Sequence, residues 1–441
     1  MRTPVRPPSQ GEIGKPLTAE RFLAIMNHVE GPTVRGRYCH WDKLRHLTPP
    51  AGLTHPEWWF GLKLRRHGSK PIPLRDKAGA AFTFNMVDPL PESMHHVDSL
   101  AHGVIQQPEP VTNPETRDSY LVRSLIEESI TSSQLEGAST TRAVAKKMIR
   151  EGRAPRDRSE RMIFNNYRTM QHILEIKDEY ISSDLLCEIH SMVTDGTLND
   201  QSAAGRFRRS DEEVEVTDEY GEVFHVPPPA KELKGRVDEM CKFANCETPG
   251  GFIHPVLRSM ILHFWLAYDH PFVDGNGRTA RALFYWSMLK RGYWLFEYIS
   301  ISKVIHSGPA KYGEAFLYSE TDDNDLTYFL LYHADVINRA IDELYQYIDR
   351  HTKQLADAQK DLEGFTILNY RQRDLISHAL RHPGQSFTTE SHRNSHQVAY
   401  ETARSDLMDL ADRALIRKRK VGRTWIFTPA ADLAEKLRRL N

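Results

Sequence analysis

The run His-Pro-Phe-Val-Asp-Gly-Asn-Gly-Arg at residues 270–278 is the most informative stretch of this chain, and Arg281 follows it by three positions. It brings together an imidazole, a carboxylate, two glycines and, with Arg281, two guanidinium groups. The mostly apolar segment 282–289 comes next and predicts a buried helix. A glycine-bearing loop that opens a helix is suited to hold phosphate, because backbone N–H groups and the helix dipole both favour an anion.

Each residue type in this loop has a physical task. The neutral imidazole of His270 can take a proton from a hydroxyl near neutral pH. Asp274 is a hard oxygen ligand of the kind that Mg²⁺ takes from proteins. Gly275 and Gly277 allow the backbone to approach a pyrophosphate without a Cβ in the way. Asn276 offers an amide N–H to a phosphate oxygen.

Two arginines and a phenylalanine complete the loop. Arg278 and Arg281 are three positions apart, so on a helix they share a face and can fork onto neighbouring phosphates. Phe272 is expected to anchor the loop in the core. An alternative makes His263 and His270 metal ligands together with the loop carboxylate. No further His or Cys lies nearby at ligand spacing, so this alternative is disfavoured, and we expect His263 to be structural.

The complete run resembles the signature of Fic-domain proteins, His-x-Phe-x-(Asp/Glu)-Gly-Asn-Gly-Arg-x-x-Arg, and residues 270–281 match it without departure. The resemblance implies a mainly α-helical Fic core and transfer of AMP from ATP to a hydroxyl side chain (Ser, Thr or Tyr) of a target protein. It implies His270 as general base and Asp274 as ligand of Mg²⁺. It also implies Asn276 and the loop amides as the anion cradle, with both arginines on the outer phosphates. Some members of the family move other phosphate-containing groups or remove AMP.

A second motif, Ser-Ser-Gln-Leu-Glu-Gly at residues 132–137, follows a stretch with helical apolar spacing. Taken alone, it is a solvated glutamate before a glycine helix cap. Beside the loop it resembles the family's autoinhibitory helix, which we expect near 120–137. The resemblance implies that Glu136, in a motif that starts at Ser132, pairs with Arg281 in place of the γ-phosphate of ATP. In an enzyme that removes AMP, Glu136 would instead position water.

A β-hairpin is predicted between the two motifs. Residues 214–226 alternate apolar and polar side chains around a Tyr-Gly turn and end at three prolines. By the resemblance, this hairpin is a flap over the active site. Its free edge would pair with an extended target segment and present the hydroxyl to the base. The alternative is a surface hairpin without a partner.

Composition limits the classes of function. The chain has 441 residues, 40% of them hydrophobic, which suggests two or three domains with sizeable cores. The 58 basic residues balance the 59 acidic ones, so the whole chain has no bulk attraction for nucleic acid or membranes. The four cysteines lack Cys-x-x-Cys spacing and a disulfide framework, which favours reduced thiols and a cytoplasmic location. No apolar run approaches a membrane span, and the N-terminus does not read as a signal peptide, so we expect no membrane partner.

The expected organisation has four parts. Residues 1–115 form an N-terminal region of uncertain role, and 116–345 form the Fic domain with the inhibitory helix. A helical linker at 346–369 leads to a winged helix-turn-helix-like domain at 370–441. This last segment carries fourteen Lys/Arg against eight Asp/Glu, an excess of six in a chain whose total charge is near zero.

That excess is typical of contact with a phosphate backbone. We expect a recognition helix from Ser395 to Leu410 that exposes Arg404 to the major groove of DNA. Arg419 and Arg423 of the following basic hairpin are further candidate DNA contacts. The alternative is a winged helix that serves as a protein–protein or dimer module.

Two functions from different classes therefore stand. The first is a protein adenylyltransferase that is autoinhibited by Glu136 and uses Mg²⁺ and ATP. A homo-oligomer is a possible means of controlling the release of Glu136. The second is a DNA-binding regulator whose Fic core senses nucleotide. The intact signature favours the first function, because a site that no longer catalyses need not keep the base, the carboxylate and both arginines together.

Overall fold

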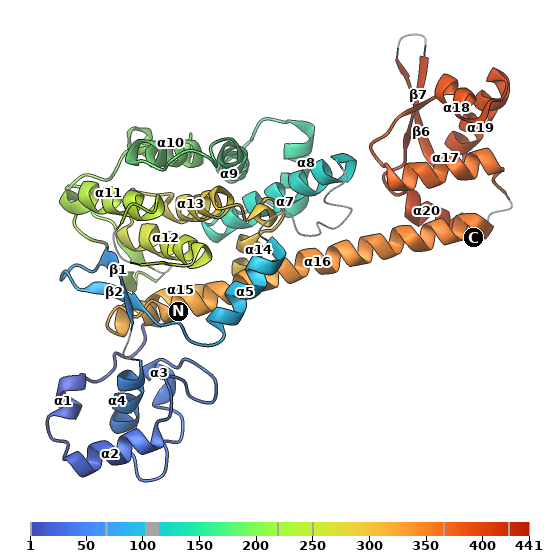
Figure 1. Ribbon diagram of the computed structural model, residues 1–441. Coiled ribbons are helices and arrows are strands. Elements are labelled where there is room, and N and C mark those ends of the chain that lie inside the picture. The colour runs from blue at the N-terminus through green and yellow to red at the C-terminus, as the bar shows by residue number, and fades with distance from the viewer. Residues whose placement is uncertain are drawn as a thin grey trace. The chain divides into compact units, whose positions relative to one another are not determined.

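Helices dominate the structure of this protein (Figure 1), and its strands form three small antiparallel sheets. The computed structural model describes residues 2–66, 69–101, 114–217, 220–248, 251–364, 367–421 and 424–440. The predicted mainly α-helical fold is confirmed. In the described part of the chain, no helix combines the length and the apolar character that crossing a membrane requires.

The described residues divide into two compact units. The first contains residues up to 101 and 124–341, and the second contains 114–123 and 342–440. The N-terminal elements of the first unit are α1 (Gln10–Gly14), α2 (Ala19–His28), α3 (Trp41–Leu44), α4 (His55–Arg65), β1 (Lys70–Arg75), β2 (Ala81–Phe84) and α5 (Leu90–Ala101). Helix α4 begins at a capping box in which Thr54 and Glu57 satisfy each other's backbone N–H groups. It buries an aromatic cluster around Trp59.

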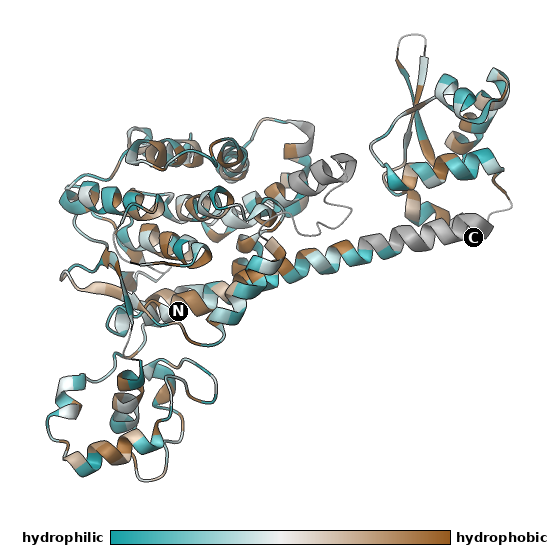
Figure 2. Cartoon of the chain, in the orientation of Figure 1, coloured by the Kyte–Doolittle hydropathy of each residue, from teal (hydrophilic) through white to brown (hydrophobic). Residues whose placement is uncertain are grey.

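The remaining elements of the first unit follow in chain order. They are α7 (Pro114–Leu135), α8 (Arg142–Glu151), α9 (Arg158–Glu175), α10 (Ser183–Thr194), η1 (Gln201–Ala203), β3 (Val216–Thr217), β4 (Val223–His225), η2 (Ala230–Glu232), α11 (Leu233–Ala244), α12 (Pro255–Asp269), α13 (Asn276–Lys290), η3 (Trp294–Glu297), α14 (Ile301–His306), α15 (Pro309–Thr321) and α16 (Thr327–Gly364). Helices α7 and α16 each contribute residues to both units. Along α16, hydrophobic residues recur between hydrophilic ones in Figure 2, as an amphipathic helix requires.

Strands β3 and β4 form the predicted hairpin, with Val216 opposite His225 and Thr217 opposite Val223. Positions 218 and 219 of its turn lie outside the described residues. One residue after β4, the three prolines at 227–229 prevent the strand from continuing.

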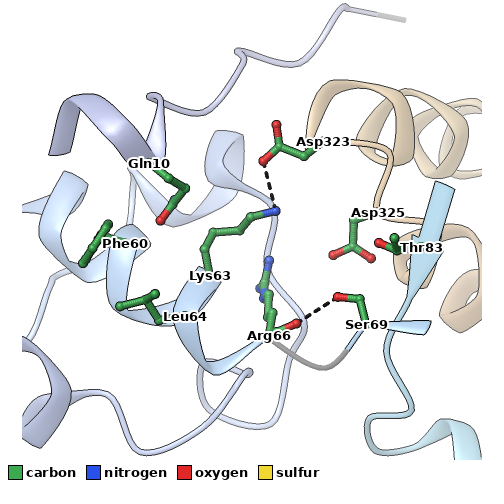
Figure 3. A pocket seen from close by; sticks show the side chains of 9 residues that line it. All are labelled: Gln10, Phe60, Lys63, Leu64, Arg66, Ser69, Thr83, Asp323 and Asp325. Carbon is green, nitrogen blue, oxygen red and sulfur yellow. Dashed lines mark hydrogen bonds and ion pairs between the residues drawn. The ribbon is translucent and has the colours of Figure 1, made fainter. Parts of the chain in front are cut away.

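Two cations at the end of α4 attach the N-terminal helices to the segment before α16 and to the first turn of α16. Lys63 Nζ lies 2.8 Å from Asp322 Oδ1, and Arg66 donates to the hydroxyl of Tyr328 at 2.8 Å. Arg66 and Asp322 are 2% and 0% exposed, and their charged groups lie 3.6 Å apart. Figure 3 shows Lys63 and Arg66 side by side, with Asp323 reaching toward Lys63. These buried charges fix the N-terminal helices on the core.

We expect Arg66→Met to lower the free energy of unfolding by roughly 3 kcal/mol, because removing one member of a buried ionic cluster leaves its partners uncompensated. Lys43→Met is the matched control, since Lys43 and Glu314 form a largely exposed pair. That substitution should cost less than about 1 kcal/mol. Urea unfolding followed by tryptophan fluorescence measures both. Similar small losses in the two variants would contradict the role given to Arg66.

The packed pair α12 and α13 forms the centre of the first unit. Pro255 occupies the first turn of α12, where its missing N–H costs nothing, and the His254 side chain caps the helix at the N–H of Val256. Nearly every residue of both helices is buried, as all-round apolar helices require. Residues 270–275 connect them, so the loop stands on two rigid elements.

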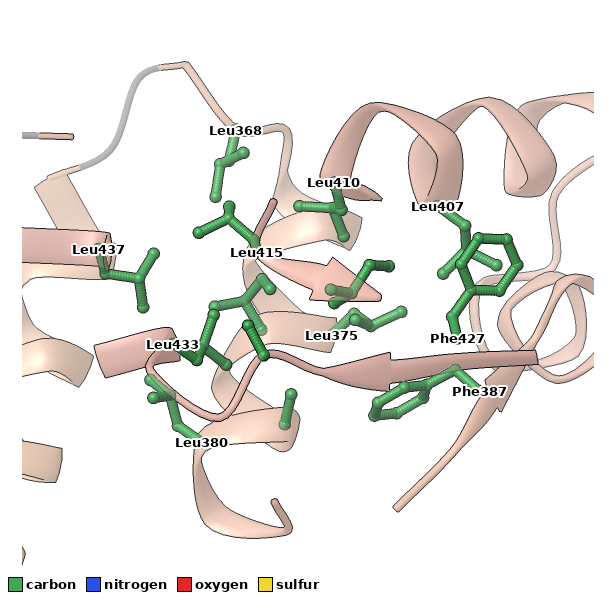
Figure 4. Packing of buried hydrophobic residues seen from close by; sticks show 14 residues of the cluster. Leu368, Leu375, Leu380, Phe387, Leu407, Leu410, Leu415, Phe427, Leu433 and Leu437 are labelled. Atoms are coloured by element: carbon green, nitrogen blue, oxygen red, sulfur yellow. The ribbon is translucent and has the colours of Figure 1, made fainter. Parts of the chain in front are cut away.

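The second unit ends in a small helical and β domain. Its elements are α17 (Tyr370–Arg381), β5 (Phe387–Thr388), α18 (Thr389–His396), α19 (Tyr400–Asp412), β6 (Ile416–Val421), β7 (Thr424–Pro429) and α20 (Leu433–Leu440). The sheet order is β5-β7-β6, antiparallel throughout. In Figure 4, leucines from α17, α19 and α20 converge with Phe387 and Phe427 of the sheet on one core.

The predicted helix from Ser395 to Leu410 is wrong at its start. Ser395 lies in the last turn of α18, and α19 begins only at Tyr400. Gln397, with φ of 49°, takes the left-handed conformation that ends α18. Serine is typical of helix N-caps, but here α18 is already capped by Thr388 and continues through Ser395.

Candidate active site

His270 ends α12 in the left-handed conformation, with φ of 44°. Its Nδ1 lies 3.2 Å from the carbonyl oxygen of Ala267, so Nδ1 carries the proton and donates it. The other ring nitrogen, Nε2, then remains as an acceptor. Burial lowers the pKa of His270 to about 4, so the ring is neutral at physiological pH. A neutral imidazole with a fixed tautomer is suited to act as a base.

The backbone at His270 is held from a distant segment. Arg208 Nε donates to the carbonyl oxygen of His270, and the N–H of Arg208 donates to that of Pro271, both at 2.9 Å. Before the loop, buried Asp269 pairs with Arg236 at 2.7 Å and accepts from the indole of Trp265 at 2.9 Å. Burial raises the pKa of Asp269. Sequence reasoning did not identify Arg208 or Arg236 as site residues.

Asn276 holds the loop closed with its side chain, which corrects the role that the sequence suggested. Asn276 Oδ1 accepts from the N–H of Phe272 at 2.9 Å, and Nδ2 donates to the carbonyl oxygen of the same residue at 2.8 Å. Both ends of the amide are therefore engaged within the loop, and only its backbone N–H belongs to the helix N-terminus. Gly275, with φ of 84°, makes the turn that this closure needs.

Arg281 meets the upstream motif at the end of α7. Arg281 Nε donates to the hydroxyl of Ser132 at 2.8 Å. Arg281 Nη2 donates to the Ser132 carbonyl oxygen and to Glu136 Oε1, both at 2.9 Å. Arg281 is 2% exposed and Glu136 is 27% exposed. The structure thus brings Ser132, Glu136 and Arg281 together. A charge-assisted pair with the arginine this deeply buried is strong.

The carboxylate of Glu136 also presses against Gly277 in the first turn of α13. A Cβ at Gly277 would lie 2.2 Å from Glu136 Oε1, so only glycine permits this approach. The N-terminus of a helix favours an anion through its free N–H groups and its dipole. Glu136 is therefore an internal anion in the position where the loop sequence predicts phosphate.

Helix α7 is anchored to the core by a buried glutamate of its own, Glu128. Glu128, 2% exposed, accepts from the hydroxyl of Tyr285 at 2.9 Å, from Ser300 at 2.8 Å and from the N–H of Ser302 at 3.1 Å. The hydroxyl of Ser302 donates to Glu128 as well, so displacement of this buried carboxylate would break four hydrogen bonds. The segment that carries Glu136 therefore follows a helix that is fixed on the core.

Arg278 and Asp274 lie beside each other, away from His270. Arg278 donates to the carbonyl oxygen of Val193 at 3.0 Å, and its charged group is 3.9 Å from Asp274 Oδ1. Burial lowers the pKa of Arg278, and its Nε has no hydrogen-bond partner among the described residues. Asp274 is 44% exposed, and its Oδ2 lies 3.5 Å from Arg158. Asp274 is thus an exposed carboxylate next to the N-terminus of α13, which favours anions. Such a carboxylate fits Mg²⁺, which takes one or two protein carboxylates and completes its shell with phosphate and water.

His190, which the sequence did not single out, supports the loop from α10. Its Nδ1 accepts from the N–H of Gly205 at 3.0 Å, so Nε2 carries the proton and donates to the carbonyl oxygen of Asp274 at 2.8 Å. The ring stacks on Phe272 with centroids 3.7 Å apart. Burial lowers its pKa to about 4. Phe272 is fully buried, as the sequence suggested for its anchoring role.

A cavity of about 590 Å³ is lined by residues of the loop, of α13 and of the upstream motif. His270, Gly277, Arg281 and Glu136 share its wall, whereas Asp274 and Arg278 are not part of it. The other lining residues are Leu135, Val216, Thr217, Phe224, His225, Ala267, Tyr268, Pro309, Ala310, Tyr312, Gly313, Phe316, Leu317 and Glu320. This volume suits a ligand the size of a nucleotide. Both hairpin strands contribute lining residues, so the hairpin forms part of the wall of the cavity that contains His270.

His225 ties the hairpin down. Its Nε2 lies 2.7 Å from the carbonyl oxygen of Tyr268, and its Nδ1 lies 2.7 Å from Glu320 Oε2 on α15. Each ring nitrogen therefore lies within hydrogen-bond distance of an oxygen on a different helix. The hairpin is thus fixed to α12 and α15 through His225.

His263 takes part in a different cluster. Its ring nitrogens lie 2.8 Å from the hydroxyl of Tyr312 and 2.8 Å from His333 Nε2. Among the described residues, no group of three or more His, Cys, Asp or Glu is arranged to hold a metal ion. The alternative of a His263 and His270 metal centre therefore finds no support.

The predicted DNA contacts belong to the second unit. Arg404 is exposed on α19 and lies 3.4 Å from Glu401, and Arg419 is exposed on β6. Arg423 lies outside the described residues.

Comparison with known proteins agrees with this geometry. The sequence model of the Fic/DOC family matches residues 180–288. A protein adenylyltransferase Fic of Nematostella vectensis is 28% identical over 191 residues, which are 42% of this chain and 40% of that protein. One of Aedes aegypti is 33% identical over 117 residues, 26% of this chain and 21% of that protein. The chain thus spans less than half the length of these curated relatives.

Among solved structures, a Fic family protein from Desulfovibrio desulfuricans G20 is similar in fold. The TM-score is 0.51 at 17% identity, with 79% of this chain and 98% of that chain covered.

Proposed function

We propose that this chain, whose residues 180–288 form a Fic/DOC family domain, is a protein adenylyltransferase that is inhibited by its own Glu136. The curated relatives named protein adenylyltransferase Fic support the reaction class. The observation that carries the proposal is the shared wall of the cavity. There a neutral, partly buried histidine lines the same cavity as an arginine and a helix N-terminus that already hold a carboxylate.

In the proposed reaction, a hydroxyl oxygen of the target attacks the α-phosphorus of ATP and pyrophosphate leaves. Nε2 of His270 takes the hydroxyl proton, while the Nδ1 hydrogen bond to Ala267 keeps the ring oriented. Arg281 and the N–H groups at the start of α13 hold phosphate oxygens. Asp274 would hold Mg²⁺, which neutralises developing charge on the phosphates. Positioning and charge neutralisation supply most of the catalysis in such transfers.

Inhibition follows from the position of Glu136. The carboxylate occupies both Arg281 and the space over Gly277, so the terminal phosphate of ATP cannot take either. ATP would then bind with its α-phosphorus out of line for attack. Glu128 holds α7 in place, so we infer that relief involves rotation of the Glu136 side chain rather than departure of the helix.

Labelled nucleotide tests the reaction class. The Glu136→Gly variant is incubated with Mg²⁺ and ATP that carries radioactive phosphorus at the α or, separately, at the γ position. Retention of the α label alone on the protein is expected for AMP transfer. Retention of the γ label would mean transfer of the terminal phosphate. If neither label is retained although ATP binds, AMP removal or another donor nucleotide replaces the proposal.

A second activity is proposed for the C-terminal domain, with the boundary near residue 370 that the sequence suggested. The order helix, strand, two helices and a two-stranded hairpin, with β5 added to the sheet, supports a winged helix. Arg417, Lys418, Arg419 and Lys420 are consecutive and all exposed on the edge strand β6. Four adjacent exposed cations on a hairpin strand favour contact with the phosphate backbone of duplex DNA.

We expect the full-length chain to bind duplex DNA with an affinity that falls steeply as salt rises. Arg417→Gln/Arg419→Gln should weaken binding and reduce the slope of log K against log salt by about 2, because each arginine that neutralises a phosphate contributes roughly one to this slope. Lys436→Gln in α20 of the same domain serves as the control and should leave the slope unchanged. Fluorescence anisotropy with a labelled duplex measures both. Binding that is absent, or insensitive to salt, would argue for a protein-binding role instead.

A further inference from the structure

A second cavity adjoins the reaction cavity, as we call the cavity lined by His270 and Arg281, at the hairpin. It has a volume of about 420 Å³ and shares five lining residues with the first, namely Phe224, His225, Tyr268, Leu317 and Glu320. We call this whole second cavity the outer groove. Its lining residues that are not shared with the first cavity are Thr3, Arg6, Asp76, Lys77, Ala78, Val223, Val226, Thr321 and Asn324. The outer groove thus continues from β4 to the N-terminal segment and to the turn between β1 and β2.

The acidic side chains of the outer groove are already engaged. Asp76 accepts from the N–H groups of Ala78 and Ala80 at 2.9 and 2.8 Å, and from the amide of Asn324 at 2.8 Å. These hydrogen bonds lower the pKa of Asp76 against the opposing effect of burial. Glu320 is paired with His225 at 2.7 Å. Among the described residues, neither carboxylate forms an ion pair with the cations of the groove.

Those cations, Arg6 and Lys77, are exposed, and within the described ranges neither makes an ion pair with an acidic side chain. The N-terminal segment that carries Arg6 is itself held in place. Arg2 and the N–H of Val5 both bond to the Asp42 carboxylate, at 3.3 and 3.2 Å. The Thr3 hydroxyl donates to Glu222 at the hairpin, at 3.1 Å. Among the described residues, two cations without acidic partners therefore stand on anchored backbone at the exit from the reaction cavity.

We propose that the outer groove binds an acidic stretch of the target polypeptide next to the acceptor hydroxyl. This proposal rests on the proposed protein adenylyltransferase activity. A polypeptide that places a hydroxyl near His270 and passes the hairpin meets the outer groove within a few residues, because the two cavities share β4. Unpaired cations there attract carboxylates and disfavour cationic segments, which gives selectivity more than affinity.

The test uses two fluorescein-labelled synthetic peptides, each with one threonine flanked by three aspartates or by three lysines on both sides. Their binding to the full-length Glu136→Gly protein is measured by anisotropy in low salt, with Mg²⁺ and a non-hydrolysable ATP analogue. The aspartate peptide should bind about tenfold more tightly than the lysine peptide. Added salt should shrink this ratio, since the groups are exposed. Arg6→Glu/Lys77→Glu should reverse the preference.

The matched control is Lys15→Glu/Arg168→Glu, which changes the net charge equally at two exposed positions outside the groove. It should leave the preference intact. Equal binding of the two peptides, or the same reversal in the control, would overturn the outer groove as an acidic-segment site. Self-modification of the same proteins by ATP is read in parallel. Its loss from Glu136→Gly would count against the proposed enzyme, whereas its presence with equal peptide binding would remove only the groove.

Discussion

Glu136→Gly should raise the rate of self-modification by ATP roughly 10- to 100-fold, the range that corresponds to a hydrogen-bonded charge pair of about 1.5–3 kcal/mol. The physical reason is that the Glu136 carboxylate and the terminal phosphate of ATP compete for the same position beside Arg281 and Gly277. With Glu136 present, Arg281 and the space over Gly277 hold a carboxylate at 2.9 Å. Without it, both can hold the terminal phosphate, and the α-phosphorus comes into line with the attacking oxygen. Intact mass spectrometry over time gives the rates.

Two further variants sharpen this prediction. Glu136→Gln keeps the size of the side chain but not its charge, so its rate should lie between those of wild type and Glu136→Gly. Ser132→Ala removes the hydroxyl that accepts from Arg281 Nε and leaves the carboxylate, so it should raise the rate only slightly. A Glu136→Gly rate equal to that of wild type would show that this contact does not limit the reaction.

His270→Asn in the Glu136→Gly background should reduce transfer by a factor of roughly 10² to 10⁴, the usual contribution of a positioned base. Binding of ATP with Mg²⁺ should change little, because the His270 ring lines the cavity and does not hold the terminal phosphate. Asparagine is chosen because residue 270 has φ of 44°, a conformation that asparagine tolerates better than alanine. Calorimetric titration of ATP and the rate of mass gain separate the two effects.

The pH dependence adds an independent check on the base. Burial disfavours the charged ring and lowers the pKa of His270 to about 4, so protonation should inactivate the base only in acid well below 6.5. The transfer rate of Glu136→Gly should therefore stay level from pH 8 down to about 5 and fall below that. A fall centred near pH 6.5 would mean that His270 is solvated in the reacting complex. Joint loss of ATP binding and transfer in His270→Asn would indicate a structural histidine.

Much of the site could be predicted from the sequence because its residues are close together in the chain. The spacing from His270 to Arg281 determines which groups a loop and one helical turn can present, and the cavity wall contains both of these residues. The pairing of Glu136 with Arg281 joins distant segments. It could be anticipated only because the upstream motif resembled a known inhibitory helix, and the contact lies at 2.9 Å.

The rest depended on the packing of distant segments, which residue spacing does not reveal. His190 and Arg208 support the loop by hydrogen bonds to its backbone carbonyls, and backbone partners leave no sequence pattern. Asn276 was assigned to phosphate, but its amide closes the loop on Phe272. Arg278 shares a helix with Arg281, yet it donates to Val193 away from the cavity.

The central claim is an AMP transferase in which Glu136 inhibits and His270 acts as base. One measurement tests these parts together: the intact mass of wild type, Glu136→Gly and Glu136→Gly/His270→Asn after incubation with Mg²⁺ and ATP. We expect a gain of the mass of AMP in Glu136→Gly, little gain in wild type and none in the double variant. Equal gains in all three proteins, or no gain in Glu136→Gly although it binds ATP, would contradict it.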